Sequence, residues 1–178
     1  MALKERLQEI HGTKGASKDG LEEGVRALAG AITDKLKVKP DEIAILLVTS
    51  TGATLKFVWP PALAQSNSVL PVDHKNAVAS SVLASKRGKV DNKISESKHL
   101  KFFENVKGME TSGLPIQKMV ALPLLNGPAP LGVLEVSRKG KTPEAAGQDF
   151  TPEDAQALVA IAREAAPLLA KLVPDPFL

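Results

Sequence analysis

The chain has 178 residues, of which 43% are hydrophobic and 24% are charged, with a formal net charge of +3 and no cysteine. This composition is typical of one globular domain with its own hydrophobic core, and it is unlike that of a disordered chain. The absence of cysteine excludes disulfides, thiolate metal sites and thiol nucleophiles.

Membrane and nucleic-acid functions are not indicated. No apolar stretch reaches the roughly 20 residues that a membrane-spanning helix requires, and the charges in Met1-Ala2-Leu3-Lys4-Glu5-Arg6 are unlike a signal peptide. We therefore expect a cytoplasmic protein. Basic residues are scattered among acids, tyrosine is absent and tryptophan occurs once, so neither a phosphate-binding stripe nor an aromatic platform for nucleic acid is expected.

The N-terminal part is expected to begin with an arm. Leu3, Leu7 and Ile10 have helical spacing and predict a short helix over residues 3–10. The glycine-rich segment 12–20 predicts a flexible connection, so we interpret residues 1–20 as an arm outside the domain. Apolar residues at helical spacing then predict an amphipathic helix over residues 21–37, which Pro40 ends.

A pair of strands and a helix follow. Residues 43–48 are apolar on both faces and predict a central strand, and residues 55–59 alternate as its hairpin partner. Asp73 predicts the cap of a helix over residues 74–86. The segment 89–115 is less regular but too apolar for a disordered linker, so we expect a short strand and a helical turn there.

The C-terminal part carries the strongest local signals. Residues 119–125 and 131–136 predict two strands joined at Asn126-Gly127, because Asn-Gly supplies the backbone angles of a tight hairpin turn. Thr151 and Pro152 predict the cap and first residue of a long last helix, which Pro167 is expected to kink or break. We expect residues 21–173 to form the domain and residues 174–178 a loose tail.

The order of these elements and their motifs resembles a GAF domain. The resemblance implies an α+β, profilin-like fold, with an antiparallel sheet of five or six strands and the first and last long helices on one face. On the other face, the middle helix and the irregular segment would enclose a small-molecule pocket. The matching motifs are Gly88 with Ile94, Glu96, Phe102 and Phe103; Ala121-x-Pro123-Leu124; Leu131-Gly132-Val133-Leu134; and Phe150-Thr151-x-x-Asp154.

The resemblance also restricts the ligand. Cyclic-nucleotide-binding GAF domains carry Asn-Lys after the last strand and Asp-Glu at the start of the last helix, whereas this chain has Arg138-Lys139 and Asp154-Ala155. These two departures argue against cyclic nucleotides. Lys139, Phe150 and Asp154 are then expected to form a structural clasp between strand and helix. Without cysteine, the family's thiol-dependent reduction of methionine sulfoxide and its cysteine-linked bilins are excluded, and any other cofactor is unknown.

Glu135 is the most prominent candidate for a ligand contact, because it shares the face of an apolar strand with Leu131 and Val133. If this face lines the pocket, the carboxylate would bind a cationic or hydrogen-bonding group; if the strand lies near an edge, it is solvated. Trp59 either covers a ligand or caps the core. Four further candidates come from the middle helix and the irregular segment: Ser80, Asn92, Phe102 and Phe103.

Patterns for metals and catalysis are weak. His11, His74 and His99 have no partner at metal-ligand spacing, so no metal site is expected. Gly140-Lys141-Thr142 resembles the end of a phosphate-binding loop, but Glu135 stands where the loop needs glycine. No serine elbow occurs, and no catalytic residue is assigned.

The sequence therefore predicts a non-enzymatic sensory or regulatory domain that binds an unidentified small molecule. It would signal through a protein partner or through a homodimer formed by the helix 21–37 and the last helix. A ligand-free interaction or dimerisation module is the first alternative. An enzyme that uses a closed polar pocket around Glu135 is the second.

Overall fold

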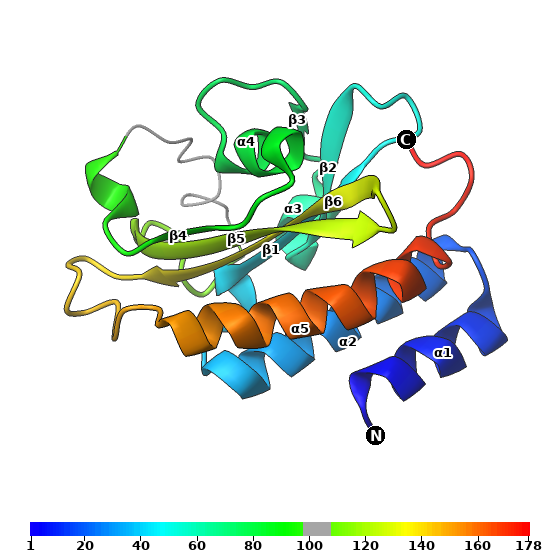
Figure 1. The fold of residues 1–178 in the computed structure, drawn as a ribbon, viewed down its shortest axis with the longest axis horizontal. Coiled ribbons are helices and arrows are strands. Elements are labelled where there is room, and N and C mark those ends of the chain that lie inside the picture. Colours follow the sequence, from blue (N-terminus) through cyan, green and yellow to red (C-terminus); the bar gives the residue numbers. More distant parts are fainter. Residues whose placement is uncertain (98–107) are drawn as a thin grey trace.

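The computed structural model describes residues 1–97 and 108–178. Within these residues, six strands form one antiparallel sheet in the order β3-β2-β1-β6-β5-β4 (Figure 1). This confirms the expected antiparallel sheet of five or six strands. The strands are β1 (Ile43–Val48), β2 (Thr54–Trp59), β3 (Val69–Pro71), β4 (Lys89–Asp91), β5 (Ile116–Asn126) and β6 (Ala129–Lys139).

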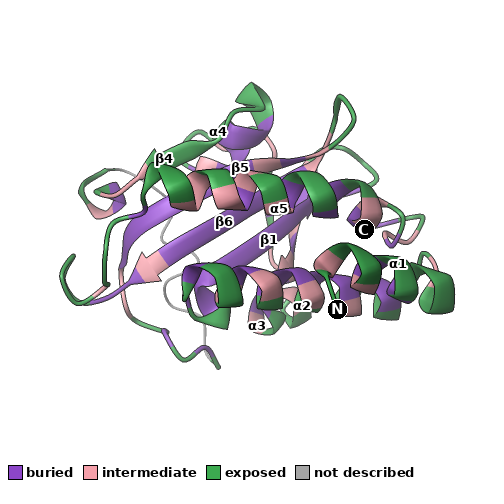
Figure 2. Ribbon diagram, turned by 60° about the horizontal axis from the view of Figure 1, so that its bottom comes forward, coloured by how far each residue is buried: buried purple, intermediate pink, exposed green. Residues whose placement is uncertain are grey.

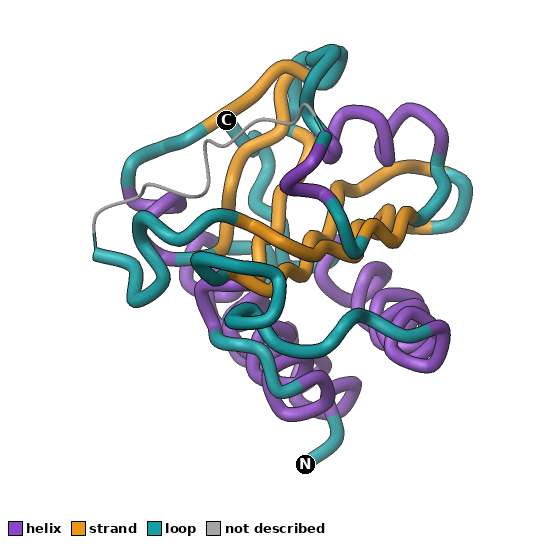
Figure 3. The backbone as a smooth tube through the Cα atoms, turned by 90° about the vertical axis from the view of Figure 1, so that its left-hand side faces the viewer, coloured by secondary structure: helices purple, strands orange, loops and turns teal. Residues whose placement is uncertain are grey.

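Helices cover both faces of this sheet. The long helices lie together on one face, and α4 lies on the other, as the α+β GAF-like arrangement requires (Figures 1 and 3). None of the helices formed by the described residues is long and apolar enough to cross a membrane. The helices are α1 (Leu3–Lys14), α2 (Lys18–Leu36), α3 (Pro61–Gln65), α4 (Val78–Ser85) and α5 (Pro152–Ala170), with 3-10 turns at Pro40–Glu42 and Ile94–Glu96.

β5 and β6 form a long hairpin, in which β6 is one of the two central strands of the sheet and β5 lies between β6 and the edge strand β4. Its loop is Gly127-Pro128, because Asn126 already pairs with Ala129. Gly127 has a φ of 62°, and glycine at the first position of a two-residue loop suits the twist of the flanking strands. The predicted hairpin is confirmed, although the turn lies one residue beyond the expected position.

The helix face of the sheet is closed by an apolar layer of α1, α2 and α5. Figure 2 shows the inner sides of these helices as buried and their outer sides as exposed. At the start of α5 the Thr151 hydroxyl accepts a hydrogen bond from the Asp154 N–H, which confirms the predicted cap. The expected break at Pro167 is wrong, since α5 runs to Ala170. Pro167 and Arg163, whose carbonyl loses its helical partner at Pro167, are both exposed residues.

The flexible arm expected over residues 1–20 is also incorrect. Two helices occupy most of it, and Leu7 and Ile10 are buried in the same core as α2 and α5. Gly15, at a φ of 59°, ends α1, and the Ser17 hydroxyl accepts a hydrogen bond from the Gly20 N–H to cap α2. The glycines therefore form a tight corner between two packed helices rather than a linker.

The C-terminal segment is docked, contrary to the expected loose tail. Phe177 is 7% exposed and joins the helix-face core. Its carbonyl accepts a hydrogen bond from the Ser50 N–H, and its own N–H donates to the Ser50 hydroxyl, each at 2.7 Å. The buried ring and the paired backbone hold this segment against the turn between β1 and β2.

Candidate functional site

The space between α4 and the sheet contains a second hydrophobic core, beside which the ionisable side chain of Glu135 is buried. Apolar side chains of α4, β1, β5 and β6 meet there, among them Val82, Leu46 and Val133. Glu135 points to the same side as Val133, because residues two apart on a strand share a face. Its neighbours in register on the adjacent strands are Ala44 and Ala121. The carboxyl thus lies in a layer of small side chains beneath α4.

Glu135 is 8% exposed, and the backbone N–H of Ala79 in α4 lies near its carboxyl. Burial raises the pKa of Glu135 from 4.5 to about 7, while the nearby Ala79 N–H opposes this rise. Near neutral pH the group therefore exists in both protonation states. As a carboxylate it accepts hydrogen bonds, and as a neutral acid it also donates one.

The start of α4 differs from the prediction. The predicted cap at Asp73 is wrong, since Asp73 is exposed and α4 begins only at Val78. Ala77 stands at the cap position and has no side-chain acceptor, and the second helical N–H, that of Ala79, lies near the carboxyl of Glu135 on β6. The carboxyl thus lies beside the first turn of the helix that covers it.

Ser80 lies on the buried side of α4, and its hydroxyl donates to the Pro71 carbonyl at 2.9 Å. This bond ties α4 to the edge strand β3. Whether Ser80 also contacts a ligand stays a prediction.

The Asn92 side chain forms hydrogen bonds with the backbone of Phe150. Its amide nitrogen donates to the Phe150 carbonyl at 3.0 Å, and its amide oxygen accepts from the Phe150 N–H at 2.8 Å. This pair joins the segment after β4 to the start of α5. Its ligand role stays a prediction, and the observed geometry gives it a structural function.

The clasp residues lie at the junction of β6 and α5. Phe150 is buried, and the Arg138 guanidinium lies 4.8 Å from the centre of its ring. The Asp154 carboxylate accepts a hydrogen bond from the Thr151 N–H, whereas the Lys139 N–H donates to Glu42. A direct pair between Lys139 and Asp154 stays a prediction.

Trp59 lies away from Glu135, in the core of the helix face. Its indole N–H donates to the Pro40 carbonyl at 2.8 Å, and the ring is 9% exposed. Phe102 and Phe103 lie outside the described residues. Among residues 1–97 and 108–178, no three histidine or acidic side chains are grouped so that they could hold a metal ion.

Sequence reasoning therefore missed how Glu135 is surrounded. The nearby Ala79 N–H and the flanking Ala44 and Ala121 become visible only once the packing of α4 and the register of the strands are known. The available signal was a carboxylate in an apolar strand, which has to be paired or solvated somewhere.

No protein-family model matches the chain, and no curated protein sequence matches it either. Solved structures do match. A segment of a methyl-accepting chemotaxis protein, residues 122 to 287, is 16% identical with a TM-score of 0.67 and covers 96% of both chains. The GAF domain of an Acinetobacter phosphoenolpyruvate-protein phosphotransferase is 17% identical with a TM-score of 0.65, over 94% of this chain and 90% of that one.

An enzyme shares the same architecture. Free methionine-R-sulfoxide reductase from Neisseria meningitidis, in complex with its substrate, is 16% identical with a TM-score of 0.59, over 95% of this chain and 89% of that one. The fold therefore occurs in proteins of more than one kind and does not by itself decide the activity. The sheet order, the two helical layers and these similar structures show that the chain has the fold of a GAF domain.

Proposed function

We propose that the chain is a sensory or regulatory domain that binds a small molecule between α4 and the sheet, with Glu135 as its polar contact. The observation that carries this proposal is the buried carboxyl of Glu135, which Ala44 and Ala121 flank in register and which lies near the backbone N–H of Ala79. Burying a carboxyl that has few polar partners lowers the free energy of unfolding. A role of Glu135 in ligand recognition would explain its presence at this position. The similar structures from a chemotaxis protein and a phosphotransferase support a regulatory role.

The chemistry of Glu135 suggests the ligand class. A carboxylate in an apolar layer is best matched by a group with several N–H donors, such as an amine, an amidinium or a primary amide. A cationic group would also favour ionisation and so lower the raised pKa of Glu135. The ligand would then be a small cationic or amide-bearing metabolite with an apolar part against Val133 and the α4 side chains.

The nearness of Glu135 to the Ala79 N–H suggests how binding is transmitted. A ligand that takes over the carboxyl would change its interaction with the first turn of α4, and α4 would shift. The change would pass to a protein partner or to a second copy of the chain, for which α2 and α5 offer their outer faces. This coupling belongs to the proposal together with the ligand.

An enzymatic role is supported by the similarity to free methionine-R-sulfoxide reductases of the same fold. Cysteine-dependent reduction is closed to this chain, which has no cysteine. We therefore propose a non-enzymatic domain.

The proposal is tested by a thermal-shift screen of amines, guanidines, amides and carboxylates against the wild-type protein, Glu135→Gln and the exposed control Glu144→Gln. Binding to the folded state raises the melting temperature. We expect hits among the nitrogen donors that Glu144→Gln retains and Glu135→Gln loses or weakens about tenfold. Hits confined to carboxylates, or hits that Glu135→Gln retains in full, would contradict the assignment of Glu135.

A further inference from the structure

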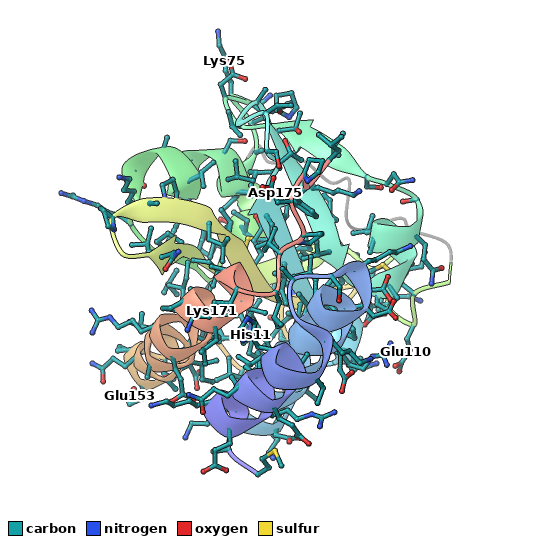
Figure 4. All side chains as sticks on the ribbon, turned by 90° about the vertical axis from the view of Figure 1, so that its right-hand side faces the viewer. His11, Lys75, Glu110, Glu153, Lys171 and Asp175 are labelled. Carbon is teal, nitrogen blue, oxygen red and sulfur yellow. The ribbon has the colours of Figure 1, made fainter. Side chains whose placement is uncertain are left out.

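A groove of about 520 Å³ lies between α2, the segment from β2 to α3, and the C-terminal residues. It is separate from the space beneath α4, since Trp59 and the α2 residues Leu21 and Val25 that line it belong to the core of the helix face. Figure 4 shows the C-terminal segment, with Asp175 labelled, passing over this side of the molecule beside α2 and β2. The volume lies within the range of roughly 300–1,000 Å³ that small-molecule sites occupy.

The apolar lining of the groove is fixed in place before any ligand arrives. Trp59 is held by the hydrogen bond from its indole N–H to the Pro40 carbonyl at 2.8 Å. Phe177 is held by the two hydrogen bonds that its backbone shares with Ser50. Rigid aromatic surfaces of this kind bind an apolar group without a further ordering cost.

The charged residues that line the groove are mostly basic. Lys18, Arg26 and Lys56 contribute three positive side chains and Glu22 one negative side chain, and the Lys56 Nζ also donates to the main-chain oxygen of Leu178, another lining residue, at 2.6 Å. Lys18 and Glu22 approach to 4.0 Å, with both side chains largely exposed, so this pair neutralises little. Lys56 extends over the Phe177 ring, 5.6 Å from its centre. A cationic group therefore stands directly above an aromatic surface.

We propose that this groove binds an organic anion with an apolar body, such as a carboxylic acid that carries an aryl or alkyl group. The apolar body lies against Trp59 and Phe177, and the anionic end is bound by Lys56 and Arg26. The excess of positive charge selects an anion over an amine of the same shape. The inference is independent of the site at Glu135, which takes a nitrogen donor on the other face.

Trp59 provides the readout, because it is the one tryptophan of the sequence. The probe is 4-phenylbutanoate, compared with 4-phenylbutylamine, which has the same apolar body and the opposite charge. We expect a saturable change in Trp59 fluorescence with the acid below about 10 mM, and binding of the amine at least about tenfold weaker. No saturable change with the acid, or equal affinity for the amine, would overturn the proposal.

Variants then locate the bound anion. We expect Lys56→Gln and Arg26→Gln each to weaken binding of 4-phenylbutanoate by about five- to tenfold. Lys56→Gln also removes the hydrogen bond from Lys56 to the main-chain oxygen of Leu178 at 2.6 Å, so it changes the wall of the groove as well as its charge. Arg26→Gln removes a positive charge and leaves that hydrogen bond in place. Lys75→Gln is the matched control, since Lys75 points away from the body of the molecule in Figure 4.

Three outcomes would overturn the assignment of the groove. The first is less than a twofold change in both groove variants. The second is a loss in Glu135→Gln instead, which would place the anion beneath α4. The third is an affinity that falls as the protein concentration rises, which would indicate that a second copy of the chain occupies the groove.

Discussion

The two faces of the sheet differ in the side chains that the same strand, β6, contributes to each of them. On the helix face, β6 contributes Leu134 and Val136 to an apolar core closed by three helices. On the α4 face, the same strand contributes Val133, the carboxyl of Glu135 and the hydroxyl of Ser137, all of them buried. One face is therefore built for stability, whereas the other retains polar groups whose burial costs free energy.

The largest expected effect comes from making the same Leu→Ala substitution in each of the two cores. Leu28 of α2 is fully buried on the helix face, whereas Leu83 of α4 is 9% exposed. We expect Leu28→Ala to lower the free energy of unfolding by about 4 kcal/mol and Leu83→Ala by about 2 kcal/mol, because a rigid three-helix layer collapses less around a cavity. Urea denaturation of both variants measures this difference. Equal losses would mean that the two cores are equally well packed.

The second effect concerns pH. Because the pKa of Glu135 is raised from 4.5 to about 7 in the folded protein, its contribution to stability is present in full below the unfolded pKa and is lost as the pH rises through 7. Glutamine does not titrate. From pH 5 to pH 8, the stability of Glu135→Gln should therefore rise relative to wild type by roughly 2–3 kcal/mol. A constant difference across this range would refute the shift, and Glu144→Gln serves as the control.

A third expectation concerns Asn92, which joins the two faces through Phe150. Asn92→Ala leaves a buried N–H and a carbonyl of Phe150 without their partner, so we expect a loss of about 2 kcal/mol. Asn76→Ala is the matched control, since Asn76 is exposed. If the two variants unfold at the same urea concentration, Asn92 is not a structural tie and its ligand role gains weight.

The smallest expected effect lies on the outer surface of the helix layer. A Cβ added at Gly30 meets no atom within 4 Å, whereas one added at Gly24 lies 2.5 Å from Leu172 Cδ1. Gly30→Ala should stabilise the protein by up to about 1 kcal/mol through helix propensity. At Gly24 the contact with Leu172 should offset that gain. Thermal unfolding of both variants checks the contrast between the two sides of α2.

Much of the fold could be predicted because local signals and burial agreed. The strands on either side of Gly127 and the cap at Thr151 depend on backbone angles and a nearby acceptor, which the neighbouring residues determine. The strand over residues 43–48 has an uninterrupted apolar pattern, and both its faces are covered. The turn and the cap are specified locally, whereas the strand over residues 43–48 is recognised by its apolar pattern although its partner β6 lies far along the chain.

The errors occurred where a distant partner decides the conformation. Gly15 and Gly20 suggest flexibility until the packing of α1 on α2 is known, and Phe177 suggests a loose end until Ser50 is placed beside it. The start of α4 was missed because the acid beside its first turn is Glu135, far along the chain, and not the neighbouring Asp73. The same holds for the candidate site. Glu135 could be identified from its residue type, whereas its alanine neighbours on the adjacent strands are known only from the register.

The most direct test of the difference between the faces is a ¹³C NMR titration of the glutamate side-chain carboxyls. The Glu135 signal is assigned by its absence from the spectrum of Glu135→Gln. We expect this carboxyl to titrate with a midpoint near pH 7, as its burial beneath α4 requires. A midpoint near the ordinary 4.5 would show a solvated carboxylate and would contradict a buried ligand-binding acid on this face.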